Sequence, residues 1–262
     1  MSTLATVDLY DRVRAAADIY EPAAIVTIVA GEGMGRKIAI IGDEHLGSLG
    51  TAELDDQAAH HAEQLFDLQR SETVTVPGPT GEIDLFYDVY PAPPTLIIFG
   101  AVHVAQPLTH LAKLLGFRVM INDARAMLAT AERFPEADQV LVAWPQDALP
   151  TYRITRNTYI AILTHDPKFD EPALLGSLET NARYIGAVGS RKTNRERKER
   201  LRKAGVSDES ISRIRGPVGL DIGANSPEEM AVSILAEIIA VRKGRAGGPL
   251  TESTGSIRGE TV

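Results

Sequence analysis

The sequence contains no cysteine. That absence excludes disulfide bonds, thiolate metal sites and a cysteine nucleophile. The chain also lacks an excess of positive charge, because 27 lysines and arginines stand against 35 aspartates and glutamates, which gives a formal net charge of −8. General binding to nucleic acid or to an anionic membrane is therefore not expected, although a local basic patch can still hold one anion. We expect partners that are proteins or small molecules.

Long apolar segments are missing as well. No uninterrupted apolar run approaches the roughly 20 residues of a membrane-spanning helix. No cationic start followed by an apolar run marks a secretory signal, so we expect a cytoplasmic protein without membrane association. The chain does have an ordinary globular composition, with 262 residues of which 44% are hydrophobic and 24% charged. That is enough to bury one large core or two modest ones.

A proline-rich linker over residues 91–94 divides the chain, since three of its four residues are proline and favour a stiff extended connector. Residues 1–90 carry helical spacing and β-branched apolar runs, which predict a small α+β domain. In residues 95–243, strand-like runs alternate with helical stretches, which predicts a Rossmann-like doubly wound parallel sheet with helices on both faces. Residues 244–262 hold few large apolar side chains and are expected to form a flexible tail.

The spacing also predicts individual elements. In the first domain we expect helices over residues 6–19 and 51–68 and strands over 23–30, 37–41 and twice within 72–90. In the second domain, five strands are expected to begin at Thr95, Phe117, Gln139, Thr158 and Arg183. The fold class is therefore α/β, with a smaller α+β domain in front of the Rossmann-like sheet.

Residues 95–125 read as strand, glycine turn, helix, strand and acid. In the dinucleotide-binding pattern G-x-G-x-x-G/A, Gly100 and Ala105 hold the outer positions, while Val102 holds the middle one. Glycine normally stands there because a bare backbone can approach a pyrophosphate, so Val102 opposes tight pyrophosphate binding and leaves room only for a looser or displaced phosphate. His103, at the mouth of the turn, is either a contact for an anion or cofactor or a structural histidine.

An acid ends the second strand of this unit. Asp123 follows Gly100 by 23 residues, close to the roughly 20-residue interval at which a Rossmann acid meets ribose hydroxyls. The alternative is that Asp123 caps the strand end and pairs with Arg125. The helix between them is expected to end at Gly116 and to bury one face, formed by Val104, Leu108, Leu111 and Leu115.

Another polar cluster is expected beside the glycine turn, because ligands of doubly wound sheets lie outside the carboxyl ends of the strands. The fourth strand is followed by a hydroxyl, an imidazole and acids: Thr164, His165, Asp166 and, beyond Lys168, Asp170. A helix cap needs an aspartate or a threonine but not the histidine between them, so we predict a binding site.

Two later loops complete the candidate site. Gly189 and Ser190 begin a helix where free amides and basic side chains form an anion site. The remaining arginines and lysines of residues 191–203 are expected on a solvated helix face, where Glu196 and Glu199 are interspersed among them as ion-pair partners. Asp221 lies in a loop that either shapes the pocket or turns the chain, ahead of a helix predicted from the capping box of Ser226, Pro227 and Glu229.

Five ordered motifs resemble the XdhC/CoxI family: GAVHVA, ERFPEAD, LTHD, YIGAVGSRK and GPVGLDIGANSPEEMAVSILAEI. The resemblance covers residues 95–243. It implies a Rossmann domain in an accessory protein that handles molybdenum cofactor for molybdenum hydroxylases such as xanthine dehydrogenase. It also implies a homodimer, the commonest symmetric assembly of soluble proteins.

Three departures from the family pattern mark a divergent member. Residues 47–50 fit the family's G-S-I-G start, but Glu53 stands where the family has a cysteine and Asp55 where it has a glutamate. A segment rich in glycine, serine, proline and arginine is shortened to GEGMGR at residues 31–36, and Val102 replaces the second glycine of G-A-G-H-x-A. A sulfur-loading or metal-protecting step favours a soft thiolate, which this chain does not possess.

Three functions remain open from the sequence. The first is a non-catalytic accessory protein that binds molybdenum cofactor, or its nucleotide form, and delivers it to an apo molybdenum hydroxylase. The second is an NAD(P)-dependent oxidoreductase in which His165 is a general acid oriented by Asp166. The third is an interaction module with a vestigial nucleotide pocket. We expect no metal site among the protein side chains.

Overall fold

The computed structural model describes residues 6–78 and 80–253. The chain forms two compact units that divide between Pro93 and Pro94. Within the described residues, no helix combines the length and the apolar character needed to cross a membrane. Of the expected tail, residues 254–262 lie outside the description, and the part before them contains a short 3-10 helix, Leu250–Glu252.

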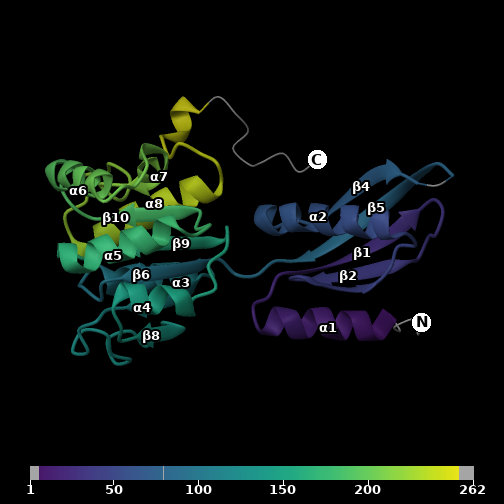
Figure 1. Ribbon diagram of the computed structural model, residues 1–262, viewed down its shortest axis with the longest axis horizontal. Coiled ribbons are helices and arrows are strands. Elements are labelled where there is room, and N and C mark those ends of the chain that lie inside the picture. The colour runs from purple at the N-terminus through teal and green to yellow at the C-terminus, as the bar shows by residue number, and fades with distance from the viewer. Residues whose placement is uncertain (1–5, 79, 254–262) are drawn as a thin grey trace. The chain divides into compact units, whose positions relative to one another are not determined.

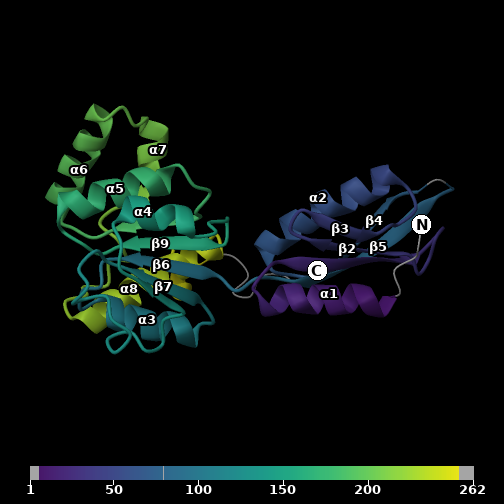
Figure 2. The same ribbon diagram turned by 60° about the horizontal axis from the view of Figure 1, so that its bottom comes forward.

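The amino-terminal unit is a five-stranded antiparallel sheet with a helix on each face (Figures 1 and 2). The strand order is β3-β2-β1-β5-β4. Its elements are α1 (Thr6–Asp18), β1 (Ala23–Ala30), β2 (Lys37–Ile41), β3 (Glu44–Gly47), α2 (Ala52–Leu68), β4 (Glu72–Pro77) and β5 (Glu82–Tyr90). The short strand β3 was not expected from the sequence.

Strand β1 shows why both faces of this sheet are covered. Successive side chains of a strand point to opposite faces, so Ala23 and Ile25 join the hydrophobic cluster of α1, while Ala24 and Val26 join that of α2. A strand that is buried on both faces reads as a continuous apolar run, which explains the sequence AAIVTIVA.

The carboxyl-terminal unit is a six-stranded parallel sheet in the order β11-β10-β9-β6-β7-β8, the strand order of a Rossmann fold. Its strands are β6 (Thr95–Phe99), β7 (Arg118–Asn122), β8 (Gln139–Leu141), β9 (Thr158–Ile162), β10 (Tyr184–Ala187) and β11 (Ile214–Arg215). Its helices are α3 (Ala105–Leu114), α4 (Pro145–Ala148), α5 (Pro167–Leu178), α6 (Arg191–Lys203), α7 (Asp208–Ser212) and α8 (Pro227–Arg242), with a 3-10 helix at Leu149–Thr151. The predicted fold class is confirmed.

Two hydrophobic clusters cover the faces of this sheet, and the helices that contribute to them lie on its two sides (Figure 2). Leu96 and Ile98 of β6 pack with side chains of α3 and α8, while Ile97 and Phe99 pack with side chains of α4 and α5 on the other face. The strand order reverses between β6 and β9, which are neighbours. The loops that follow the carboxyl ends of these two strands therefore run in opposite directions, and a crevice forms between them.

Helix α3 corrects one packing prediction. Leu115 was expected in the core, but the helix ends at Leu114 and Leu115 is 47% exposed. The buried face consists of Ala105, Leu108, Thr109 and Ala112. Small alanines allow the helix to approach its neighbours closely, so the buried face is centred on them and not on the leucine at the helix end.

Candidate functional site

A crevice of about 520 Å³ opens at the carboxyl ends of β6 and β9. Its lining comes from three segments: Val102 in the glycine turn, Arg125 after β7, and Thr164, His165, Asp166, Pro167 and Phe169 after β9. Four residues that the sequence proposed, Val102 and residues 164–166, therefore meet in one cavity. They are brought together by the pairing of two strands that are far apart in sequence.

Gly100 sets the distance between the glycine turn and the loop after β9. Its φ is +108°, in the region that favours glycine. A Cβ built there would lie 2.6 Å from Cγ2 of Thr164 and 3.1 Å from its backbone nitrogen. Gly100 is thus required for the close packing of two protein segments, because the lack of a side chain allows Thr164 to lie against the turn.

Asp123 lies beneath the crevice and is 3% exposed. Its Oδ2 accepts hydrogen bonds from the Ala101 backbone at 2.8 Å and from Nη2 of Arg125 at 2.7 Å, and its Oδ1 accepts from Nε of Arg125 at 2.9 Å. Burial alone would raise the pKa of Asp123, but these hydrogen bonds outweigh burial and lower it. Both carboxylate oxygens of Asp123 are used within the protein, and Arg125 is the member of this ion pair that lines the crevice, together with Asp166.

A buried network lies behind the loop after β9. The hydroxyl of Thr164 donates to Oδ1 of Asp170, and Nη2 of Arg197 donates to Oδ2 of Asp170 at 2.7 Å. Burial raises the pKa of Asp170, while the bonds from Thr164 and Arg197 act in the opposite direction. Arg197 also donates to the Val188 carbonyl oxygen at 3.0 Å, so the network joins the ends of two neighbouring strands to α5 and α6.

Arg197 overturns the prediction that the basic residues of 191–203 form only a solvated face. Its side chain is 2% exposed, because α6 turns Asn194, Arg197 and Leu201 inward. These residues follow i, i+3, i+7 spacing. Leu201 is the one apolar residue of the α6 sequence, so its position marked the buried face and could have revealed Arg197.

An aromatic ring that the sequence motifs did not single out, that of Phe169, lines the crevice. Phe169, in the first turn of α5, stacks on Trp144 with ring centroids 4.5 Å apart and an interplanar angle of 9°. The guanidinium carbon of Arg125 lies 5.7 Å from the centroid of the Phe169 ring. Asp166 caps α5 by accepting a hydrogen bond from the Lys168 backbone. The signal for Phe169 was a large ring among the charged residues that begin a helix.

The other predicted residues have different surroundings. His103 is exposed next to the crevice, and Asp221 is exposed in the loop before α8. Gly189 and Ser190 begin α6, where Ser190 caps the helix by accepting a hydrogen bond from the Thr193 backbone. Among the residues that the structure places, these four lie outside the crevice lining. The capping box at Ser226 and Glu229 is present as predicted.

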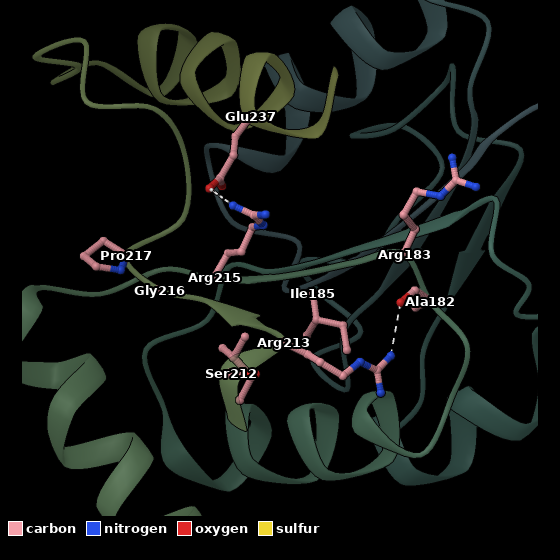
Figure 3. Close-up of a pocket in the computed structure, with 10 residues that line it drawn as sticks. Ala182, Arg183, Ile185, Ser212, Arg213, Arg215, Gly216, Pro217 and Glu237 are labelled. Atoms are coloured by element: carbon pink, nitrogen blue, oxygen red, sulfur yellow. Dashed lines mark hydrogen bonds and ion pairs between the residues drawn. The ribbon is translucent and has the colours of Figure 1, made fainter. Parts of the chain in front are cut away.

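A second hollow of about 450 Å³ lies at the sheet edge beside β11 (Figure 3). Arginines dominate its charge, but Arg213 donates to three backbone carbonyl oxygens, those of Leu178, Thr180 and Ala182. Glu237 accepts hydrogen bonds from the Tyr184 hydroxyl at 2.6 Å and the Gly219 backbone at 2.8 Å. These contacts tie α8 and the C-terminal end of α5 to the sheet. The hollow is therefore built from structural contacts, and the crevice remains the candidate site.

Metal ligands do not gather in either place. Across residues 6–78 and 80–253, no three histidine, aspartate or glutamate side chains are grouped as a metal site would require.

Comparison with known proteins identifies relatives of this chain. It is 35% identical over 180 residues to a probable xanthine dehydrogenase subunit of Bacillus subtilis (strain 168), and the match covers 68% of this chain and 52% of that protein. It is 30% identical over 147 residues to the molybdenum cofactor insertion chaperone PaoD of Escherichia coli (strain K12), and that match covers 56% of this chain and 40% of the chaperone. The chain thus spans about half the length, or less, of these curated relatives.

A solved structure shares the fold. The crystal structure of a xanthine dehydrogenase from Bacillus halodurans matches with a TM-score of 0.54 and 21% sequence identity, over 94% of this chain and 98% of that one. The model of the XdhC Rossmann domain matches residues 96–238, more than half of the chain. Those residues hold the glycine turn, the buried network and the whole crevice. The chain belongs to the XdhC family.

Proposed function

We propose that this protein is an accessory protein that binds a molybdopterin-type cofactor in the crevice and assists its insertion into an apo molybdenum hydroxylase such as xanthine dehydrogenase. The observation that carries the proposal is the crevice itself, formed at the switch point of the family's Rossmann domain and lined by Arg125, His165 and Phe169. The names of two relatives, a cofactor insertion chaperone and a xanthine dehydrogenase subunit, support the same role.

The residues of the crevice fit such a cofactor, which consists of a flat pterin, a phosphate group and sulfur atoms that hold its metal. Phe169 and Arg125 offer flat surfaces to a ring. At the start of α3, the Val104 side chain forms no cap, but the Ala105 N–H already donates to the Val102 carbonyl oxygen and Pro107 has no N–H. This helix start therefore offers an anion fewer N–H groups than a complete first turn does. When bound, the cofactor would supply the metal centre of the recipient enzyme.

The protein's own contribution is binding and release. Arg125 brings a positive charge that Asp123 holds in place, and the exposed His165 brings an imidazole within reach of a bound group. Val102 narrows the turn where a phosphate would approach, which favours a displaced phosphate over a deeply seated one. A site of this kind can exchange its cargo, as delivery to another protein requires.

The gene deletion tests this role. In the organism that encodes the protein, deletion should lower the activity and the molybdenum content of its molybdenum hydroxylases. The wild-type gene and an Arg195→Ala variant, changed at an exposed residue of α6, should restore both, whereas Arg125→Ala should not. Full hydroxylase activity and metal content after deletion would reject the proposal. Coelution of the protein with the apo hydroxylase checks the proposed partner, and light scattering checks the proposed homodimer.

An NAD(P)-dependent oxidoreductase is the second candidate, favoured by the Rossmann strand order. Two contacts oppose it, since the carboxylate of Asp123 is already occupied and Val102 lines the turn. Calorimetric titration with NADH and NADPH compares the wild type with Val102→Gly. Binding by the wild type would favour the oxidoreductase. Binding by Val102→Gly alone would indicate a vestigial nucleotide pocket.

A further inference from the structure

We infer that the crevice recognises a planar nitrogen heterocycle by stacking it on Phe169, and that Trp144 is a positioning residue that holds the Phe169 ring. The inference rests on the proposed function and deepens it, because it names the part of the ligand that is recognised and the side chains that bind it. Two groups of observations support it: the placement of the two rings and the fixed orientation of Arg125.

The two rings are placed where they contribute little to the core. Phe169 lines the crevice, and Trp144, the single tryptophan of the chain, is 42% exposed. Among the described residues, neither ring belongs to the clusters that cover the two faces of the sheet. Aromatic side chains that line a concave site supply the flat apolar surface on which a ligand ring is held.

Trp144 fixes the orientation of the Phe169 ring. The two rings are nearly parallel, with an interplanar angle of 9° and centroids 4.5 Å apart, a favourable offset stack. Trp144 stands at the start of α4, directly before the buried Pro145, while Phe169 is in the first turn of α5. The stack therefore joins two helix starts, and a ring held from behind loses little freedom when a ligand binds to it.

Arg125 adds a second flat surface with a fixed orientation. Its guanidinium forms two hydrogen bonds to Asp123, at 2.9 Å from Nε and 2.7 Å from Nη2, and this fork holds the plane of the group. Its central carbon lies over the Phe169 ring, 5.7 Å from the centroid, so a ligand ring on Phe169 lies beside the guanidinium and within reach of its positive charge. Guanidinium planes stack on heterocycles and also attract anionic substituents. A neutral, purely apolar ligand would make no use of this charge.

Because the chain has one tryptophan, the fluorescence of Trp144 reports directly on this stack. The full-length protein is titrated with free pterin, with AMP, and with ribose 5-phosphate, which carries a phosphate but no ring. Pterin should quench the fluorescence with saturation, and ribose 5-phosphate should not. AMP distinguishes a purine ligand from a pterin ligand, and saturation by either ring supports the stacking site. No saturable quenching by either ring, or equal quenching by ribose 5-phosphate, overturns the inference without any variant.

Variants separate stacking from simple burial. Phe169→Leu keeps an apolar side chain but removes the π face, and it should weaken binding of the quenching probe by about 5- to 150-fold, the range that corresponds to losing one stacked base. Trp144→Phe keeps the stack and should bind within about twofold of the wild type in calorimetry, whereas Trp144→Ala should bind less tightly. Val232→Ala, at an exposed position of α8, is the control. Wild-type affinity in a folded Phe169→Leu variant overturns the inference.

The outcomes also separate this inference from the proposed function. If pterin quenches Trp144 but the deletion strain keeps fully active hydroxylases, the accessory role fails and the stacking site stands. If the deletion impairs the hydroxylases, yet neither ring quenches Trp144 and Phe169→Leu restores activity, the stacking site fails and the accessory role stands.

Discussion

Arg197 and Asp170 form an ion pair inside the Rossmann unit, with Nη2 and Oδ2 2.7 Å apart and side chains that are 2% and 3% exposed. The pair joins α6 to α5, and the Thr164 hydroxyl donates to the same carboxylate. Taking two charges out of water is costly, and hydrogen bonds to the Thr164 hydroxyl, the Val188 carbonyl oxygen and the Asn194 side chain offset part of this cost. Nε of Arg197 finds no hydrogen-bond partner among the described residues. Here the pair holds the residue that begins the crevice loop.

Arg197→Met should lower the free energy of unfolding by about 3–5 kcal/mol, because it leaves the Asp170 carboxylate buried without its cation. Urea denaturation at neutral pH measures this loss. The matched control is Arg195→Ala, an exposed position on the same helix, which should change stability by less than about 0.5 kcal/mol. Equal losses in the two variants would contradict the role of the buried pair.

Gly100→Ala and Gly116→Ala separate backbone strain from steric overlap. Both glycines have positive φ, +108° and +77°, which costs a residue with a side chain roughly 1 kcal/mol. A Cβ at Gly100 would lie 2.6 Å from the Thr164 side chain, whereas nothing lies within 4 Å of a Cβ at Gly116. Gly100→Ala should therefore be less stable than Gly116→Ala by at least about 1 kcal/mol. Thermal unfolding compares them, and similar melting temperatures would argue against the close approach.

The lowered pKa of Asp123 predicts how the stability of the protein changes in acid. Its folded pKa lies below its ordinary value, so its ionised form stabilises the fold above roughly pH 4, and this contribution is lost as pH falls through the folded pKa. Asp123→Asn should cost about 1.5–3 kcal/mol at pH 7 and should lose less further stability between pH 4 and pH 2 than the wild type. Urea midpoints measured across that range provide the check. Asp221→Asn, at an exposed loop position, should follow the wild-type curve.

Two tyrosines whose hydroxyl groups are buried should respond differently to loss of the hydroxyl. The Tyr184 hydroxyl donates to Glu237 at 2.6 Å, so Tyr184→Phe should destabilise the protein by about 1–3 kcal/mol. The buried Tyr152 hydroxyl finds no hydrogen-bond partner among the described residues, so Tyr152→Phe should be neutral or stabilising. Urea denaturation at pH 7 compares the two, and a large loss in Tyr152→Phe would show that its hydroxyl is satisfied in solution.

The raised pKa of Tyr152 predicts how the stability of the protein changes at high pH. Burial raises the pKa of Tyr152 to about 12. The stabilising effect of keeping its proton is therefore complete below roughly pH 10, the unfolded pKa, and is lost as pH rises toward the folded value. Tyr152→Phe should lose less stability than the wild type between pH 10 and pH 12, as measured by urea midpoints. Identical losses would show that Tyr152 titrates as an exposed tyrosine.

Much of the Rossmann unit was predictable because its signals are local. Buried parallel strands appear as short apolar runs, as in Thr95–Phe99 and Thr158–Ile162, and the capping box at Ser226 and Glu229 involves residues three apart. The order of those runs also predicted that the glycine turn would meet the loop after β9. Strand pairing confirmed that the two segments are neighbours.

The sequence by itself determined the fold class, the family and the region of the crevice. The signals for these are the two-residue period of strands, the 3.6-residue period of helices, turns and motifs, and each depends on residues that are close together in the chain. Only the tertiary structure decided what individual polar side chains do. It assigned Asp123 to Arg125 and the Ala101 backbone, buried Arg197 against Asp170, and stacked Phe169 on Trp144. These partners are separated by up to 27 residues. Whether a charge is solvated or paired depends on distances that a linear pattern does not contain.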